Sequence, residues 1–120
     1  MQNKRVFSRV SFKSIVYLEK NKALYAGKLQ DICLQGALIE IKDNSFKAKH
    51  GDQVVFRLEL PDSDIKISSK CELVHKEQNQ YGVRFEETDI DSMTHLRNLI
   101  ELNIGDSALV SEELQRLIRR

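Results

Sequence analysis

Two short patterns in the first third of the chain combine residue types that recognise anions. Arg5 and Arg9 stand four positions apart near the N-terminus, and Asp31-x-Cys33-x-x-Gly36 follows at the junction of two expected strands. The planar guanidinium of arginine can hold a phosphate through two parallel hydrogen bonds, and a carboxylate supplies the complementary acceptor. Taken alone, a basic pair near a terminus is typical of a solvated tail, and Asp-x-x-x-x-Gly is typical of a turn between strands.

The charge of the chain is divided between a basic start and an acidic remainder. The formal net charge is +1, but residues 1–18 carry Lys4, Arg5, Arg9 and Lys13 and no acidic residue, which makes that segment +4. The other 102 residues hold 15 basic and 18 acidic side chains, a balance of −3. A protein that coats DNA or RNA needs many uncompensated cations. We therefore expect no nucleic-acid partner, and any anion should bind at the basic end.

Signatures of catalysis and of metal binding are missing from the sequence. His50, His75 and His95 lack the spacing of a zinc site, and no serine stands in a G-x-S-x-G elbow. Neither of the glycine-rich phosphate-binding patterns occurs, and the carboxylates form no recognisable acid–base pair. We therefore expect no enzyme activity, no metal and no cofactor.

Short runs that alternate apolar and polar residues, separated by turn signals, predict six strands. The clearest run places Val54, Phe56, Leu58 and Leu60 on one face, as in a strand that packs one side on a core. The expected strands are Ser14–Glu19, Ala23–Ile32, Ala37–Lys42, Val54–Leu60, Ile65–His75 and Tyr81–Phe85.

The period of the apolar residues changes from two to 3.6 after residue 88, which predicts helices at the C-terminal end. Asp89 is placed to cap the first helix and Gly105 to end it, and Ser111 is placed to cap a second helix that runs to Arg120. The first helix should bury one apolar stripe, formed by Ile90, Met93, Leu96, Leu99, Ile100 and Ile104.

These elements predict a mainly β protein, a small six-stranded antiparallel barrel with C-terminal helices. We divide the chain into a flexible basic arm at 1–12, a barrel at 13–88 and a helical segment at 89–120 that packs on the barrel. No apolar run is long enough to span a membrane, and no secretory signal is present. Cys33 and Cys71 lie far apart, which suits reduced thiols. We expect a cytoplasmic protein without membrane insertion.

In combination, the two short patterns resemble the signature of the PilZ domain, the bacterial receptor module for the second messenger cyclic di-GMP. The family pattern is R-x-x-x-R followed by D/N-x-S-x-x-G. Residues 36–39 and 81–85 are similar to two strands of the family, and residues 90–103 resemble the helical tail of single-domain PilZ proteins of gamma-proteobacteria. The resemblance covers nearly the full chain and implies the PilZ β-barrel fold.

The resemblance implies a receptor that binds cyclic di-GMP and relays the signal by conformational change to a partner protein. Arg5 and Arg9 would hold the phosphates and guanine edges, and Asp31 would accept hydrogen bonds from guanine N1 and N2. Gly36 would let the backbone approach the ligand closely. Lys4 would add attraction, and it leaves open whether one or two ligand molecules bind.

His75 is a further candidate, because related single-domain members place a ring near this strand end that can stack on guanine. Strict alternation puts His75 on the core side with Cys71 and Leu73. A β-bulge would turn the ring outward.

Cys33 departs from the family pattern, since it stands where the motif has serine. A thiol is a weaker hydrogen-bond donor than a hydroxyl, so Cys33 either contacts the ligand weakly or packs in the core. This departure favours an alternative function, a PilZ-like adaptor that has lost ligand binding and acts through protein contacts only.

A barrel that binds single-stranded nucleic acid is a second alternative. Such a barrel would expose aromatic side chains between basic strands. The chain has no Trp, and Phe56, Tyr81 and Phe85 fall on expected core faces, so the sequence disfavours this function.

Overall fold

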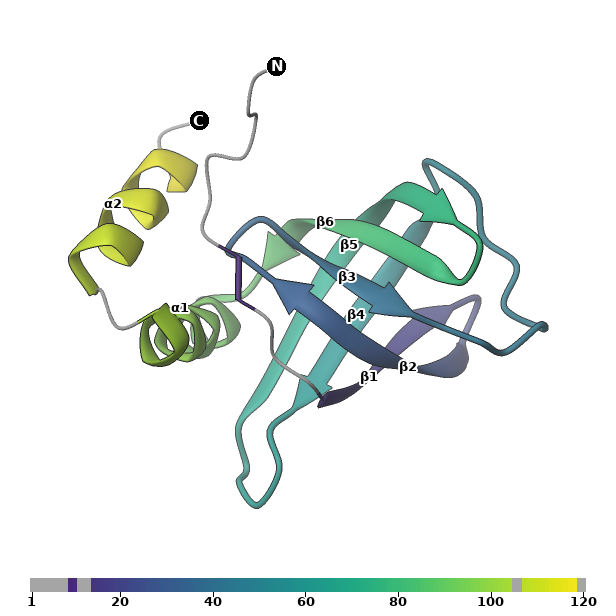
Figure 1. Ribbon diagram of the computed structural model, residues 1–120, viewed down its shortest axis with the longest axis horizontal. Helices are drawn as coiled ribbons and strands as arrows, with labels where there is room; N and C mark the ends of the chain where they lie inside the picture. The colour runs from purple at the N-terminus through teal and green to yellow at the C-terminus, as the bar shows by residue number, and fades with distance from the viewer. Residues whose placement is uncertain (1–8, 11–13, 105–106, 119–120) are drawn as a thin grey trace.

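Six strands followed by two helices make up the computed structural model, which describes residues 9–10, 14–104 and 107–118 (Figure 1). The helices are α1 (Ile90–Ile104) and α2 (Ser107–Ile118). The strands are β1 (Ser14–Lys20), β2 (Ala23–Ile32), β3 (Gly36–Glu40), β4 (Gln53–Glu59), β5 (Lys66–Glu77) and β6 (Gln80–Thr88).

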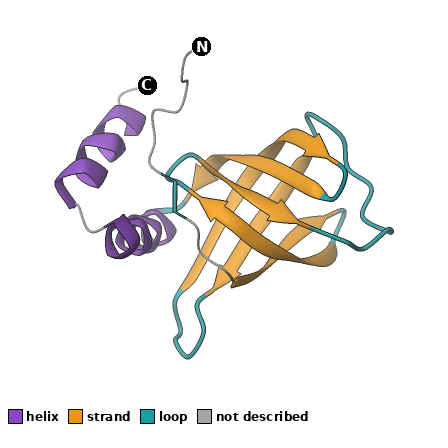
Figure 2. Ribbon diagram, in the orientation of Figure 1, coloured by secondary structure: helices purple, strands orange, loops and turns teal. Residues whose placement is uncertain are grey.

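The strands form a closed barrel in the spatial order β1-β2-β3-β6-β5-β4, and β4 pairs back with β1. Each of these pairings is antiparallel. Figure 2 shows the barrel with both helices beside it, where α1 packs against β5 and α2 against α1. The predicted class, a mainly β six-stranded antiparallel barrel with C-terminal helices, is confirmed.

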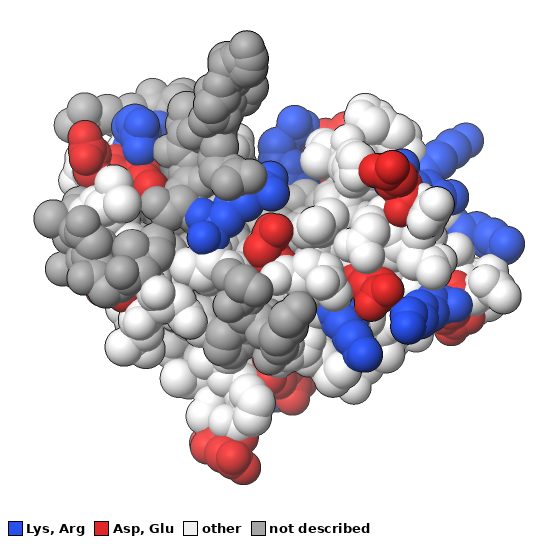
Figure 3. All heavy atoms as spheres, viewed as in Figure 1, with Lys and Arg blue, Asp and Glu red and all other residues white. Residues whose placement is uncertain are grey.

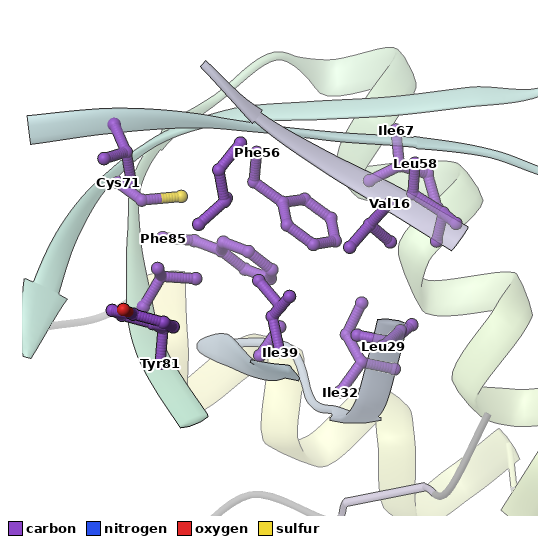
Figure 4. Close-up of a cluster of buried hydrophobic side chains, with 14 of the residues drawn as sticks. Val16, Leu29, Ile32, Ile39, Phe56, Leu58, Ile67, Cys71, Tyr81 and Phe85 are labelled. Carbon is purple, nitrogen blue, oxygen red and sulfur yellow. The ribbon is translucent and has the colours of Figure 1, made fainter. Parts of the chain in front are cut away.

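The barrel interior is filled by alternate side chains of the strands. In β4, Val54, Phe56 and Leu58 are buried as the alternation predicts. Phe56 meets Phe85 of β6 with ring centroids 5.3 Å apart. Burial of these apolar surfaces is the main stabilising contribution to the fold. Figure 4 shows side chains from other strands converging on the two rings, among them Val16, Leu29, Ile39 and Ile67.

Short turns fix the register of two hairpins. Asn21 and Lys22 join β1 to β2 with positive φ values of 54° and 70°, which suits the twist of a two-residue hairpin. Residues 78–79 join β5 to β6, with Gln78 at a φ of 55°. Because this turn takes only two residues, β5 continues to Glu77 and β6 begins at Gln80, so both strands come closer to the turn than the sequence predicts.

The predicted start of α1 is confirmed. The backbone N–H of Ser92 donates to Asp89 Oδ1 at 2.7 Å, which is the geometry of an N-cap. Leu96 and Ile100 of the predicted stripe are buried. Ile90 is 83% exposed, so its assignment to that stripe is wrong. A side chain on the first turn projects toward the N-terminal end of its helix, beyond the surface that packs on β5.

The second helix begins earlier than predicted. α2 starts at Ser107, so Ser111 lies within the helix and its predicted role as the cap is wrong. The earlier start brings Val110 into the helix, where this side chain is fully buried. Gly105 and residues 119–120 lie outside the described residues. Neither α1 nor α2, as far as they are described, is long and apolar enough to cross a membrane.

Candidate ligand-binding site

A hollow of about 580 Å³ lies on the outside of the barrel, where β3, β6 and β5 run side by side. Its volume falls in the range of roughly 300–1,000 Å³ that is usual for small-molecule sites. The structure brings together there every predicted site residue that it describes, and it adds one further charged side chain. The functional groups at the hollow are Arg9, Asp31, Cys33, Gly36, His75 and Arg84.

Asp31 and His75 reach the hollow because a β-bulge interrupts each of their strands. The pairing of β2 with β3 shifts between Leu29 and Asp31, and the pairing of β5 with β6 shifts between Leu73 and His75. Leu29 and Leu73 are fully buried, so strict alternation would turn the residues two positions later inward as well. The extra residue in each bulge turns them outward instead. Of the two orientations considered for His75, the structure shows the one produced by a bulge, and its side chain is 55% exposed.

Two glycines line the hollow on the neighbouring strands β3 and β6. A Cβ atom at Gly36 would lie 2.1 Å from the carbonyl oxygen of Val83, far inside van der Waals contact. Gly36 is thus required by the close approach of β3 to β6, and its closeness to a ligand stays a prediction. A Cβ atom at Gly82 would lie 3.0 Å from Cβ of His75, so this glycine leaves room for the histidine.

Arg9 is held at the rim of the hollow by the residue that follows it. Val10 is buried and pairs with Ile32 of β2 through two backbone hydrogen bonds of 2.9 and 3.0 Å. Arg9 Nη1 lies 3.7 Å from Asp31 Oδ2, and both side chains are partly exposed. An ion pair this long and this exposed contributes at most about 1 kcal/mol. Breaking this ion pair so that Arg9 and Asp31 can bind a ligand therefore costs little free energy.

Charge at this face is mixed rather than concentrated. Figure 3 shows acidic and basic side chains interspersed over the visible surface of the barrel. The described residues visible in Figure 3 give a long polyanion no continuous basic track. A small anion could still be held by one or two guanidinium groups at the hollow.

A family model matches most of the chain. The model of the PilZ domain matches residues 3–102. The chain belongs to the PilZ domain family. The matched region contains both short patterns of the sequence analysis and all six strands of the barrel.

Solved structures with low sequence identity share this PilZ fold. The PilZ domain of CeSA from a cellulose-synthesizing bacterium is 13% identical with a TM-score of 0.61, over 82% of this chain and 96% of that one. The Bacillus subtilis inhibitor of motility (MotI/DgrA) is 10% identical with a TM-score of 0.66, over 99% of this chain and 54% of that one. The Borreliella burgdorferi PlzA protein in complex with c-di-GMP is 14% identical with a TM-score of 0.59. That match covers 78% of this chain and 40% of PlzA, so the chain spans about half or less of the latter two proteins.

Cys33 both lines the hollow and packs against the barrel core of this PilZ domain. Its Sγ accepts a hydrogen bond from the backbone N–H of Gln35 at 3.4 Å. Burial raises the pKa of the Cys33 thiol above its usual value, although this hydrogen bond and the nearby Arg9 act against the rise. The group is therefore a neutral thiol near pH 7, and it offers a ligand only a weak donor.

We expect Cys33→Ser to tighten the binding of cyclic di-GMP by about 3- to 10-fold, since a hydroxyl donates a stronger hydrogen bond than a thiol. Calorimetric titration of both proteins measures the ratio. Unchanged affinity would place Cys33 in packing only. The unfolding midpoint of the variant in urea should be measured as well, because the Cys33 side chain also packs against the barrel core and its replacement can change stability.

Two predicted site residues lie outside the described part of the chain, and two residues at the hollow were not predicted. Lys4 and Arg5 lie outside the described residues, so their positions stay predictions. Sequence reasoning missed Arg84 and Gly82 at the hollow. Their alternate positions in the expected strand 81–85 place both residues on the same outward face of that strand. They belong to the hollow only because β6 pairs with β3.

Metal binding has no evident site in the described part of the chain. No group of three or more His, Cys, Asp or Glu side chains is placed there to hold an ion. The chemistry offered by the hollow is that of charged hydrogen bonds and of one aromatic ring.

Proposed function

We propose that this PilZ domain binds cyclic di-GMP in the hollow between β3, β6 and β5. The observation that carries the proposal is the convergence of Arg9, Asp31, Gly36 and His75 on one hollow from four separate parts of the chain. The solved complex of PlzA with c-di-GMP supports it, since that protein contains the same fold.

The ligand offers two phosphodiesters and two guanines, and the hollow offers a partner for each kind of group. Arg9 donates to a phosphate or to guanine O6 and N7, while Asp31 accepts from guanine N1 and N2. His75 presents its ring for stacking on a base. Lys4 and Arg5 precede Arg9 closely enough in sequence to supply further cationic contacts.

Binding is relayed to a partner protein through the N-terminal segment. Val10 ties this segment to Ile32 of β2, one residue beyond Asp31. A ligand that engages Arg9 and Asp31 therefore binds the residues directly before the two partners of this contact, Val10 and Ile32. Fixing each residue of the segment costs on the order of 1 kcal/mol, which charge-assisted hydrogen bonds of about 1.5–3 kcal/mol each can offset. The ordered segment then forms, or hides, the surface that the partner recognises.

Calorimetric titration of the whole chain with cyclic di-GMP tests the proposal, with GMP as the control ligand. We expect a dissociation constant of about 1 μM or lower for cyclic di-GMP. GMP carries one guanine and one phosphate, so we expect it to bind at least about 10-fold more weakly. Absence of heat and of any spectral change at high micromolar cyclic di-GMP would contradict the proposal.

A second function, an adaptor that works through protein contacts without a ligand, is favoured by Cys33 at the motif serine position. The same titration distinguishes the two functions, because an adaptor of this kind gives no signal with cyclic di-GMP.

A further inference from the structure

Arg84 of β6 lines the same hollow as Arg9 and Asp31. It pairs with Gly36 on β3 and with Glu72 on β5, so it lies at the centre of the three strands that carry the hollow. Its side chain is 44% exposed.

One end of the Arg84 guanidinium is fixed by two carboxylates. Nη2 donates to Glu72 Oε1 and, at 3.3 Å, to Glu86 Oε2. Within the described residues, Nε and Nη1 have no hydrogen-bond acceptor. Three N–H groups of a held side chain are therefore free to donate to a ligand.

The charge around Arg84 favours an uncharged part of a ligand. Arg84 with Glu72 and Glu86 carries a net charge of −1, because one guanidinium faces two carboxylates. Arg9, in contrast, faces the single carboxylate of Asp31 and forms a neutral pair. A phosphate is thus repelled more at Arg84 than at Arg9, whereas a neutral base with acceptor atoms is not.

A guanine edge has the acceptors that the free N–H groups of Arg84 require. Guanine presents O6 and N7, which are both acceptors, while adenine presents N7 beside an amino group that donates. An arginine cannot accept a hydrogen bond from that amino group.

We infer that Arg84 is a specificity-determining residue of this site, which donates to guanine and disfavours adenine, and that Glu72 and Glu86 are its positioning residues. This inference rests on the proposed function, since it concerns the base of the same ligand.

Titration of the full chain and of Arg84→Ala with cyclic di-GMP and with cyclic di-AMP tests the inference. We expect the variant to bind cyclic di-GMP about 5- to 100-fold more weakly, with a much smaller change for cyclic di-AMP, so that the preference for guanine falls. Arg57→Ala is the matched control. Arg57 is 46% exposed, pairs with Glu19 and does not line the hollow, and its loss should leave both affinities unchanged.

Arg84→Lys separates hydrogen bonding from simple charge and preserves most of the side-chain volume if the alanine variant folds poorly. Lysine keeps the charge but lacks the planar set of donors, so we expect the guanine preference to fall in this variant as well. An unaltered guanine preference in the Arg84 variants, while the wild type binds cyclic di-GMP, would overturn this inference alone. Failure of the wild type to bind cyclic di-GMP would overturn the proposed function and this inference with it.

Discussion

Replacing Arg9 with alanine is expected to weaken the binding of cyclic di-GMP by at least about 100-fold. The variant loses charge-assisted hydrogen bonds of about 1.5–3 kcal/mol each. It also leaves the Asp31 carboxylate without its partner at 3.7 Å, so the rim of the hollow changes from neutral to negative where a dianionic ligand must enter. Calorimetric titration measures the change.

Arg57→Ala is again the matched control for Arg9→Ala. Both arginines are ion-paired to one carboxylate and are similarly exposed, but only Arg9 lines the hollow. We expect the control to bind cyclic di-GMP like the wild type. Equal losses in the two variants would indicate general electrostatic attraction and would contradict a specific contact at Arg9.

Gly36→Ala is expected to lower the free energy of unfolding by about 2–3 kcal/mol. The new Cβ would lie 2.1 Å from the carbonyl oxygen of Val83, and this neighbour is backbone in a paired strand that cannot rotate away. Either the pairing of β3 with β6 separates locally or the strand bends. Urea denaturation followed by far-ultraviolet circular dichroism measures the loss.

Gly82→Ala provides the comparison for this stability prediction. Its new Cβ would approach Cβ of His75 at 3.0 Å, and the irregular pairing of β5 with β6 beside His75 allows the backbone to shift by a few tenths of an ångström. We expect a loss below about 1 kcal/mol. If Gly36→Ala is no more destabilising than Gly82→Ala, the close approach of β3 to β6 is not what requires the glycine.

The barrel could be predicted from the sequence because its strands follow simple local rules. The alternation through Val54, Phe56 and Leu58 identifies β4 and its buried face. The turn at Asn21 and Lys22 separates β1 from β2. Such signals lie within a few residues of one another, so no knowledge of the tertiary structure is needed to read them.

The parts of the site that could not be predicted depend on contacts between distant segments. The bulges that turn Asp31 and His75 outward carry no clear local signature, since they arise where neighbouring strands adjust their register. Arg84 becomes a site residue only because β6 pairs with β3. The start of α2 at Ser107 was likewise missed, because burial of Val110 outweighs the capping preference of Ser111.

The proposed function places cyclic di-GMP in the hollow between β3, β6 and β5. Titration of the isotope-labelled chain with cyclic di-GMP, followed by two-dimensional amide NMR, tests it most directly. We expect the largest shifts at the amides of Gln35, Gly36, His75 and Gly82, and no shift at Arg57 of β4, which does not line the hollow. An unchanged spectrum at high micromolar ligand, or shifts confined to other strands, would contradict it.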